Sequence, residues 1–174
     1  KKKPIEVQKG FIKDTAEDQK RFIQAKFKWG RKSITIMNGY FPQGENRSHE
    51  TKFPKKIKYY ADLKKHIKKT QKTEENLIVM GDFNVAPSPL DIGIGEINAK
   101  RWLKEGKTAF LPEEIDMWNS IRDLGFIDSW REQNPDEGSI YSWFDYRSRM
   151  FDDAPKRGLR IDHIMISENL LSEM

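Results

Sequence analysis

A short, continuously apolar run, Leu77 to Met80, constrains the fold more than any other feature of the sequence. Such a run is typical of a strand that is buried on both faces. It follows residues 54–69, whose apolar side chains recur at near-helical spacing after Pro54. Alternation of helix-like segments with buried strands indicates a layered α/β or α+β protein.

The remaining elements are expected on the same grounds. Residues 22–29 alternate between polar and apolar side chains, which predicts a strand that forms a hairpin with residues 33–37. We further expect helices at 98–105 and 113–124, and strands at 140–144 and 159–166. A length of 174 residues fits a single domain over residues 1–174.

Composition excludes several classes of protein. The chain contains no cysteine, which excludes a disulfide scaffold, a thiolate metal site and a cysteine nucleophile. No apolar run approaches the roughly 20 residues that a membrane-spanning helix needs. The first three lysines are followed by no apolar stretch of the kind found in a signal peptide. We therefore expect no membrane contact.

Charge is divided unevenly along the chain. Residues 1–72 carry 21 basic and 7 acidic side chains, whereas residues 73–174 carry 11 basic and 20 acidic ones. A basic half is typical of contact with a polyanion. An acidic half with carboxylates at strand ends is typical of cation binding. Two solvated faces would give the same distribution.

Polar side chains follow the buried strand directly. Asp82 and Asn84 lie two positions apart at its end, so they should project to the same side and contact one small ligand. The carboxylate could accept a proton or hold a water molecule, and the amide could donate to a phosphate oxygen. A simple Asx turn would explain the same pair of residues.

Two further strand ends carry candidate residues. Asp162 interrupts an apolar strand, and a buried carboxylate needs a partner or a metal. His163 should face the opposite side of that strand, outside the site. Tyr40 and Gln43 follow another strand and could donate to phosphate oxygens, although a tyrosine at a strand end more often packs in the core.

An aromatic cluster follows near residue 143. Trp143 and Phe144, with Arg147 beside them, could stack on a sugar or base, or form the edge of an ordinary core. Ligand sites of layered α/β folds lie at strand ends. Hydrolysis of a phosphodiester by a metal-activated water needs the inventory found there: carboxylates, neutral donors and a cation.

Five segments give a more specific indication. NGYFPQGE at 38–45, GDFNVAPSPLDIGIGE at 81–96, SWFDYRS at 142–148, FDD at 151–153 and GLRIDHI at 158–164 occur in this order. Together they closely resemble the exodeoxyribonuclease III branch of the endonuclease/exonuclease/phosphatase superfamily. The GDxN motif is shared across the superfamily, whereas NGYFPQGE with SWFDYR is much more specific to this branch.

The resemblance implies a fold and an activity. The fold would be an α/β four-layer sandwich, DNase I-like, with two central mixed or antiparallel sheets flanked by helices. The activity would be Mg²⁺-dependent, with Mn²⁺ as the alternative. It would cleave double-stranded DNA on the 5′ side of abasic sites and remove nucleotides and blocking groups from 3′ ends. A monomer in the bacterial cytoplasm, associated with the nucleoid, is also implied.

The same resemblance implies roles for the strand-end residues. Asp82 would orient or deprotonate the attacking water. Asn84 would hold the scissile phosphate and help align its neighbours, and both would be metal-site residues. Tyr40 would stabilise the charged transition state, and Asp162 would belong to the same hydrogen-bonded cluster.

DNA-contacting residues are implied as well. Gln43 would contact the phosphate backbone and Arg147 would be a further DNA contact. Trp143, Phe144 and Leu159 would form the pocket for the sugar that has lost its base, since an apolar pocket rejects an intact nucleotide by size and polarity.

Two elements of the family pattern have no match in this chain. The principal metal-ligating glutamate near the family's N-terminus and its terminal Ser-Asp-His segment both fall outside the sequence. We therefore expect a central part of the domain, incomplete at both termini, with low stability and little turnover by itself. The alternatives are a catalytically silent DNA-binding fragment and a phosphoesterase of the same superfamily.

Overall fold

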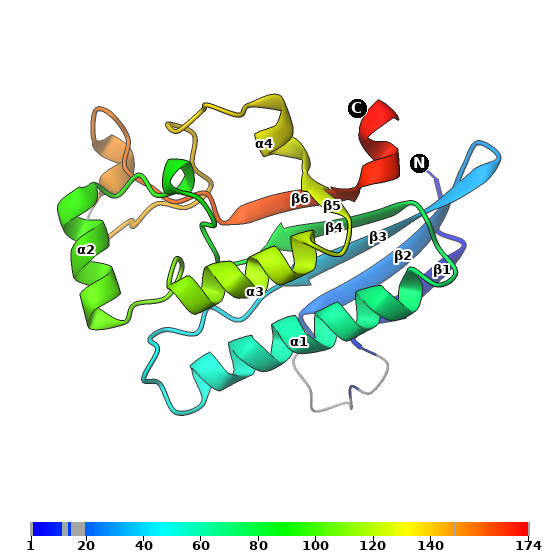
Figure 1. Cartoon of the computed structure of the whole chain (residues 1–174), viewed down its shortest axis with the longest axis horizontal. Coiled ribbons are helices and arrows are strands. Elements are labelled where there is room, and N and C mark those ends of the chain that lie inside the picture. The colour runs from blue at the N-terminus through cyan, green and yellow to red at the C-terminus, as the bar shows by residue number, and fades with distance from the viewer. Residues whose placement is uncertain (1, 12–13, 15–19, 148, 174) are drawn as a thin grey trace.

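A single mixed sheet of six strands organises the chain. The computed structural model describes residues 2–11, 14, 20–147 and 149–173, and Figure 1 shows their arrangement. The strand order is β1-β2-β3-β4-β6-β5. The strands are β1 (Glu6–Lys9), β2 (Phe22–Trp29), β3 (Lys32–Tyr40), β4 (Leu77–Asp82), β5 (Phe126–Asp128) and β6 (Asp162–Ser167). β3 and β4 are parallel, whereas all other neighbouring pairs are antiparallel.

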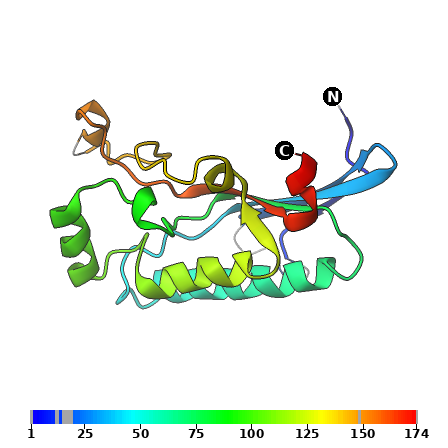
Figure 2. The ribbon, with the colours of Figure 1, turned by 45° about the horizontal axis from the view of Figure 1, so that its top comes forward.

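Helices cover one face of this sheet. Figures 1 and 2 show α1 and α3 side by side on that face. α1 supplies the long crossover that the parallel strands β3 and β4 require. The helices are α1 (Lys52–Thr70), α2 (Glu96–Glu105), α3 (Pro112–Arg122) and α4 (Ser129–Gln133), with 3₁₀ turns η1 (Pro89–Asp91), η2 (Met150–Asp152) and η3 (Glu168–Glu173). No described helix is long and apolar enough to cross a membrane.

α1 is amphipathic despite its many lysines. Its buried side chains recur every three or four residues and so lie on one face. They are Phe53, Lys56, Tyr59, Tyr60, Leu63, His66 and Ile67. Pro54 stands in the first turn, where its missing N–H costs no hydrogen bond. The position of a buried lysine in this apolar set bears on the site described below.

Two apolar clusters stabilise the structure. In the larger one, between the sheet and the helices, the rings of Phe41 and Phe83 stack at 4.2 Å. The Tyr60 hydroxyl donates to the Phe83 carbonyl at 2.8 Å. The smaller cluster gathers Ile94 and Leu159 beneath the long loop that follows β4. Both clusters pack directly against the segments that leave the ends of β3 and β4.

The opposite face of the sheet is apolar and largely uncovered by described residues. Phe22 packs towards α1, so the alternating side chains of Ile23, Phe27 and Trp29 point the other way. Ile23 and Ile164 are 40% and 46% exposed. Of the four layers that the sequence predicted, the described residues form two, a sheet and a helix layer, because all six strands join one sheet.

Most predicted elements are present, and one is wrong. Residues 140–144 do not form a strand, because Trp143 and Leu159 make only an isolated two-bond bridge. Beyond this bridge, the N–H groups of Ile161 and Asp162 donate to the Ser142 hydroxyl, both at 3.1 Å, and not to backbone carbonyls of a neighbouring strand. The predicted strand at 159–166 is correspondingly shorter at its start.

A buried ionic network stabilises the beginning of β6 on the helix-covered side. Arg160 donates from Nε to Asp91 and from Nη2 to Asp128, both at 2.7 Å. His163 donates from Nε2 to the Val85 carbonyl at 2.8 Å. Burial raises the pKa of Asp128, but hydrogen bonds from His163 and Arg160 outweigh it and hold the pKa well below the ordinary range.

We predict that Asp128→Asn destabilises the fold by about 3–5 kcal/mol at pH 7, since Arg160 loses a buried counter-charge. The Asp128 carboxyl has a lower pKa folded than unfolded, where it is about 3.9. Its contribution is therefore complete above that value and is lost as the pH falls below it. Urea unfolding at pH 7 and pH 3 measures both effects, and the variant should lack this part of the pH dependence.

Asp123→Asn is the matched control, because the Asp123 carboxylate pairs with Arg122 at an exposed position. Exposed pairs contribute little to stability. Equal losses in the two variants would contradict a structural role for the buried network.

Candidate active site

Three predicted residues form one row across the centre of the sheet. Tyr40 of β3 pairs in register with Asp82 of β4, and Asp82 pairs with Asp162 of β6. Directly opposed residues of neighbouring strands project to the same face. This is the face that none of the described helices covers, and Tyr40 is 56% exposed there. The structure thus brings together side chains that are up to 122 positions apart in the sequence.

Asn84 holds the carboxylate of Asp82. Its backbone N–H donates to Asp82 Oδ1 at 2.9 Å. Its side-chain Nδ2 donates to Asp82 Oδ2 at 3.1 Å and to the Phe41 carbonyl at 2.9 Å. Both amide hydrogens are therefore engaged within the protein. In this conformation Asn84 orients Asp82, which agrees with the predicted alignment of its neighbours, and donation from the amide to a phosphate stays a prediction.

A close backbone approach sets the register of this row. A Cβ atom at Gly81 would lie 2.0 Å from the Gly39 carbonyl oxygen, and Gly81 has a φ of +130°. Only glycine fits such a position without displacing β3 from β4. Asn84 has a φ of +53°, in the left-handed region that asparagine tolerates better than most residues.

The electrostatic environment of Asp82 is unusual for a carboxylate. Burial raises its pKa to about 6, the hydrogen bonds from Asn84 oppose that shift, and the negative charge of Asp162 adds to it. Two neighbouring carboxylates on a largely uncovered face repel each other. A bound cation or a proton would relieve this repulsion.

The residues present fit part of a site for a hard cation. The carboxylates of Asp82 and Asp162 and the side-chain oxygen Oδ1 of Asn84 are ligands of the kind that Mg²⁺ prefers, and Mg²⁺ commonly binds one or two carboxylates together with water. The described residues contain no group of three or more His, Cys, Asp or Glu side chains that could hold a metal. A complete set of protein ligands is therefore not formed by the described part of the chain.

Arg21 borders the row, and the sequence analysis did not single it out. A hollow of about 360 Å³ beside Tyr40 and Asp82 is also lined by Lys20 and Arg21. The Arg21 guanidinium lies 4.6 Å from the centre of the Tyr40 ring and donates to the Tyr40 carbonyl at 3.3 Å. The basic first half of the chain was the only signal for this cation.

Lys56 was also missed. Its side chain is fully buried on the helix-covered side and forms an ion pair with Glu114 at 2.5 Å. Burial lowers the pKa of Lys56, whereas the charge of Glu114 opposes that shift. The Lys56 ammonium donates to the carbonyls of Asn84 and Gln43 at 2.8 and 3.2 Å. The signal that could have found it is helical spacing, because Lys56 lies three residues after Phe53 and four before Tyr60, on the apolar face of α1.

The predicted DNA-contacting residues differ in their exposure. Trp143 is half-buried and bridges Leu159, which is buried in the smaller apolar cluster. Ser142 joins this segment to the backbone of Asp162. Gln43 and Arg147 are exposed on loops. Phe144 is half-buried and packs edge-on against a neighbouring tyrosine ring.

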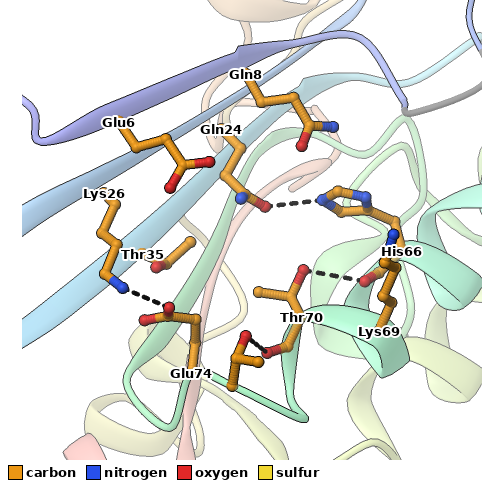
Figure 3. A pocket seen from close by; sticks show the side chains of 10 residues that line it. Glu6, Gln8, Gln24, Lys26, Thr35, His66, Lys69, Thr70 and Glu74 are labelled. Carbon is orange, nitrogen blue, oxygen red and sulfur yellow. Dashed lines mark hydrogen bonds and ion pairs between the residues drawn. The ribbon is translucent and has the colours of Figure 1, made fainter.

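His163 lies outside the row, as the alternation along β6 predicts. It is buried on the helix-covered side, where its ring contacts Phe83 and Trp118 edge-on. A second hollow, of about 240 Å³, lies between β1, β2 and the end of α1 (Figure 3). It is lined by none of the predicted residues, and its Lys26–Glu74 ion pair of 2.5 Å balances charge locally.

The mixed sheet with helices on one face is similar to solved structures of the DNase I-like class. A 3′ phosphatase from Neisseria, bound to a product DNA hairpin, has a TM-score of 0.85 and 29% identity, over 98% of this chain and 61% of that one. An AP endonuclease from Archaeoglobus fulgidus has a TM-score of 0.80 and 29% identity, over 98% and 61%.

The chain belongs to the endonuclease/exonuclease/phosphatase family, whose sequence profile matches residues 5–173. It is 49% identical over 170 residues to the exodeoxyribonuclease III of Haemophilus influenzae, which covers 98% of this chain and 63% of that protein. These matches confirm the predicted family and fold class. The chain spans less than two thirds of the length of these relatives.

We predict that the Asp82 carboxyl titrates near pH 6 when divalent cations are absent. Asp162→Asn should lower this pKa by removing a nearby negative charge. The raised pKa means that the folded state binds the proton more tightly, so this group makes folding less favourable as pH rises from about 4 to 6. Asp82→Asn should abolish that loss of stability.

Carbon-detected NMR of the side-chain carboxyls measures the pKa, and urea unfolding at pH 5 and pH 8 measures the stability. A carboxyl at position 82 that titrates near pH 4 in the folded chain would contradict this electrostatic description.

Proposed function

We propose that the full-length protein that contains these residues is a DNA-repair nuclease. It would hydrolyse double-stranded DNA on the 5′ side of abasic sites and remove nucleotides or blocking groups from 3′ ends. One observation carries the proposal: Tyr40, Asp82 and Asp162 lie in register on one face, with Asp82 oriented by Asn84. The names of the relatives, an exodeoxyribonuclease III, an AP endonuclease and a 3′ phosphatase, support it.

The reaction is attack of a water oxygen on phosphorus, with cleavage of the bond between phosphorus and the 3′ oxygen. Asp82 accepts the proton of the attacking water, and a pKa near 6 suits a base that works close to neutral pH. The Tyr40 hydroxyl donates to the phosphate oxygen on which negative charge grows. A bound Mg²⁺, or Mn²⁺ as the alternative, would neutralise charge on the phosphate and on the leaving oxygen.

Asn84 and Asp162 complete the proposed arrangement. Asn84 holds the Asp82 carboxylate in one orientation, and its side-chain oxygen Oδ1 is a candidate ligand for the cation. Asp162 belongs to the same cluster and keeps Asp82 from ionising easily when no cation is bound. Asn84 would thus keep the base oriented, and entry of a positively charged partner would favour its ionised form.

Binding of the substrate is assigned to the surrounding loops. Arg21, Gln43 and Arg147 are exposed or border the hollow, as side chains that contact phosphates must be. The sugar without its base is assigned to the segment around Trp143, which packs against the buried Leu159 and follows Ser142, whose hydroxyl accepts the N–H of Asp162. Phosphate contacts would position the duplex, and this apolar segment would select the abasic site.

A silent DNA-binding role is the second candidate for the chain by itself. It is favoured by the absence of a three-residue metal cluster among the described residues, which leaves the cation site incomplete. A phosphoesterase that acts on small esters is the third candidate. Both are tested by the same assay.

We expect the full-length protein to cut a labelled duplex at a single abasic site with Mg²⁺ and to stop when EDTA is added. Asp82→Asn should reduce kcat by about 10²–10⁴-fold, which is the range for loss of a positioned base. Tyr40→Phe should reduce kcat less, because only one hydrogen bond is lost. DNA affinity, measured by fluorescence anisotropy in EDTA, should remain close to that of the wild type.

Asp123→Asn serves as the control, because Asp123 lies at the far end of α3 and pairs only with Arg122 in the described structure. Binding without incision by the wild type would favour the silent binder. Hydrolysis of a small phosphate ester without duplex cleavage would favour the phosphoesterase.

A further inference from the structure

A fully buried ammonium group joins the two loops that leave the ends of β3 and β4. Lys56 Nζ donates to the carbonyl oxygens of Gln43, at 3.2 Å, and Asn84, at 2.8 Å. Its third bond is to Glu114 Oε1, at 2.5 Å. An ammonium carries three hydrogens, so these bonds use its full donor capacity. Both carbonyls belong to residues that the proposed function places at the substrate.

Glu114 fixes the ammonium from the other side. Its second oxygen, Oε2, accepts the N–H groups of Ala109 and Leu111 at 2.7 and 2.9 Å. The carboxylate is fully buried and lies in the first turn of α3. The ion pair therefore connects α1 and α3 to both loops through backbone groups on every side.

Stability alone does not account for charges at this position. Replacing a buried ion pair with apolar groups is often neutral or stabilising. The two carbonyls, however, would be left without a donor, and buried backbone carbonyls are almost always hydrogen-bonded. The pair is therefore better explained by the geometry that it imposes on the two loops.

We propose that Lys56 is a positioning residue of the active site, which fixes Gln43 and Asn84 relative to each other, so that Gln43 can contact a phosphate while Asn84 holds Asp82. This inference rests on the proposed nuclease function. Asn84 needs such support, because its φ of +53° is unfavourable and persists only where the surroundings enforce it. Asn84 in turn orients Asp82, so the ammonium acts on the base through one intermediate residue.

The test removes both charges together, with Lys56→Met combined with Glu114→Gln. The matched control is Lys26→Met with Glu74→Gln, which removes an ion pair of the same 2.5 Å separation in the hollow of Figure 3. The first measurement is hydrogen exchange by mass spectrometry, without DNA or metal. Peptides that cover residues 41–46 and 83–87 should exchange about tenfold faster in the first double variant only.

The second measurement is steady-state cleavage of an abasic-site duplex by the full-length protein. The Lys56 double variant should lose about 10²-fold in kcat, the scale of a misplaced catalytic group. Its KM should stay within about threefold of the wild type, because the residues that contact DNA are retained. The control double variant should keep the wild-type kcat even if its melting temperature falls.

Lys56→Gln provides a second variant if the double variant does not fold. It keeps a hydrogen-bond donor without the charge, and it should show an intermediate loss of kcat. Unchanged exchange in the two loops, or faster exchange with an unchanged kcat, would overturn the positioning role. A wild type that cleaves no DNA would overturn the proposed function, and the exchange result alone would then decide whether Lys56 holds the two loops.

Discussion

The register of the three central strands is the constraint on which the rest of the site depends. Tyr40, Asp82 and Asp162 meet only because β3, β4 and β6 align at those residues. That alignment requires glycine at position 81, where the backbones approach too closely for any side chain. Displacing β6 by one residue would turn Asp162 to the helix-covered side and bring His163 into the row.

The sheet separates two kinds of polar group. On the helix-covered side, Lys56 with Glu114 and Arg160 with Asp128 form buried ion pairs whose partners are satisfied by hydrogen bonds. Buried ion pairs are costly unless every partner is well placed, and a fully hydrogen-bonded network holds its residues rigidly. These pairs therefore make the helix-covered side rigid behind the row of Tyr40, Asp82 and Asp162. On the other side, Asp82 faces the hollow with a raised pKa and few partners. The rigid helix-covered side therefore supports the opposite face, where the charge of Asp82 is available to a ligand.

The largely uncovered face also has a consistent physical character. The apolar side chains of β2 lie on it, and Ile164 continues the same surface on β6. An apolar area of this kind is typical of an interface with another layer or partner. The row of Tyr40, Asp82 and Asp162 lies along one border of this surface, at the ends of the central strands.

The sequence by itself determined the strands and helices with strong periodicity, the family, and the strand ends that carry Tyr40, Asp82 and Asp162. Local pattern suffices there, because alternation and apolar runs reflect burial of neighbouring residues. Tertiary structure alone supplied the buried partner of Lys56, since Glu114 is distant in the chain. It also decided that residues 140–144 pair only once and that Arg21 lies over Tyr40. These features arise from contacts between distant segments, which the local sequence does not record, whereas the bond from the Asn84 N–H to Asp82 is a local Asx turn.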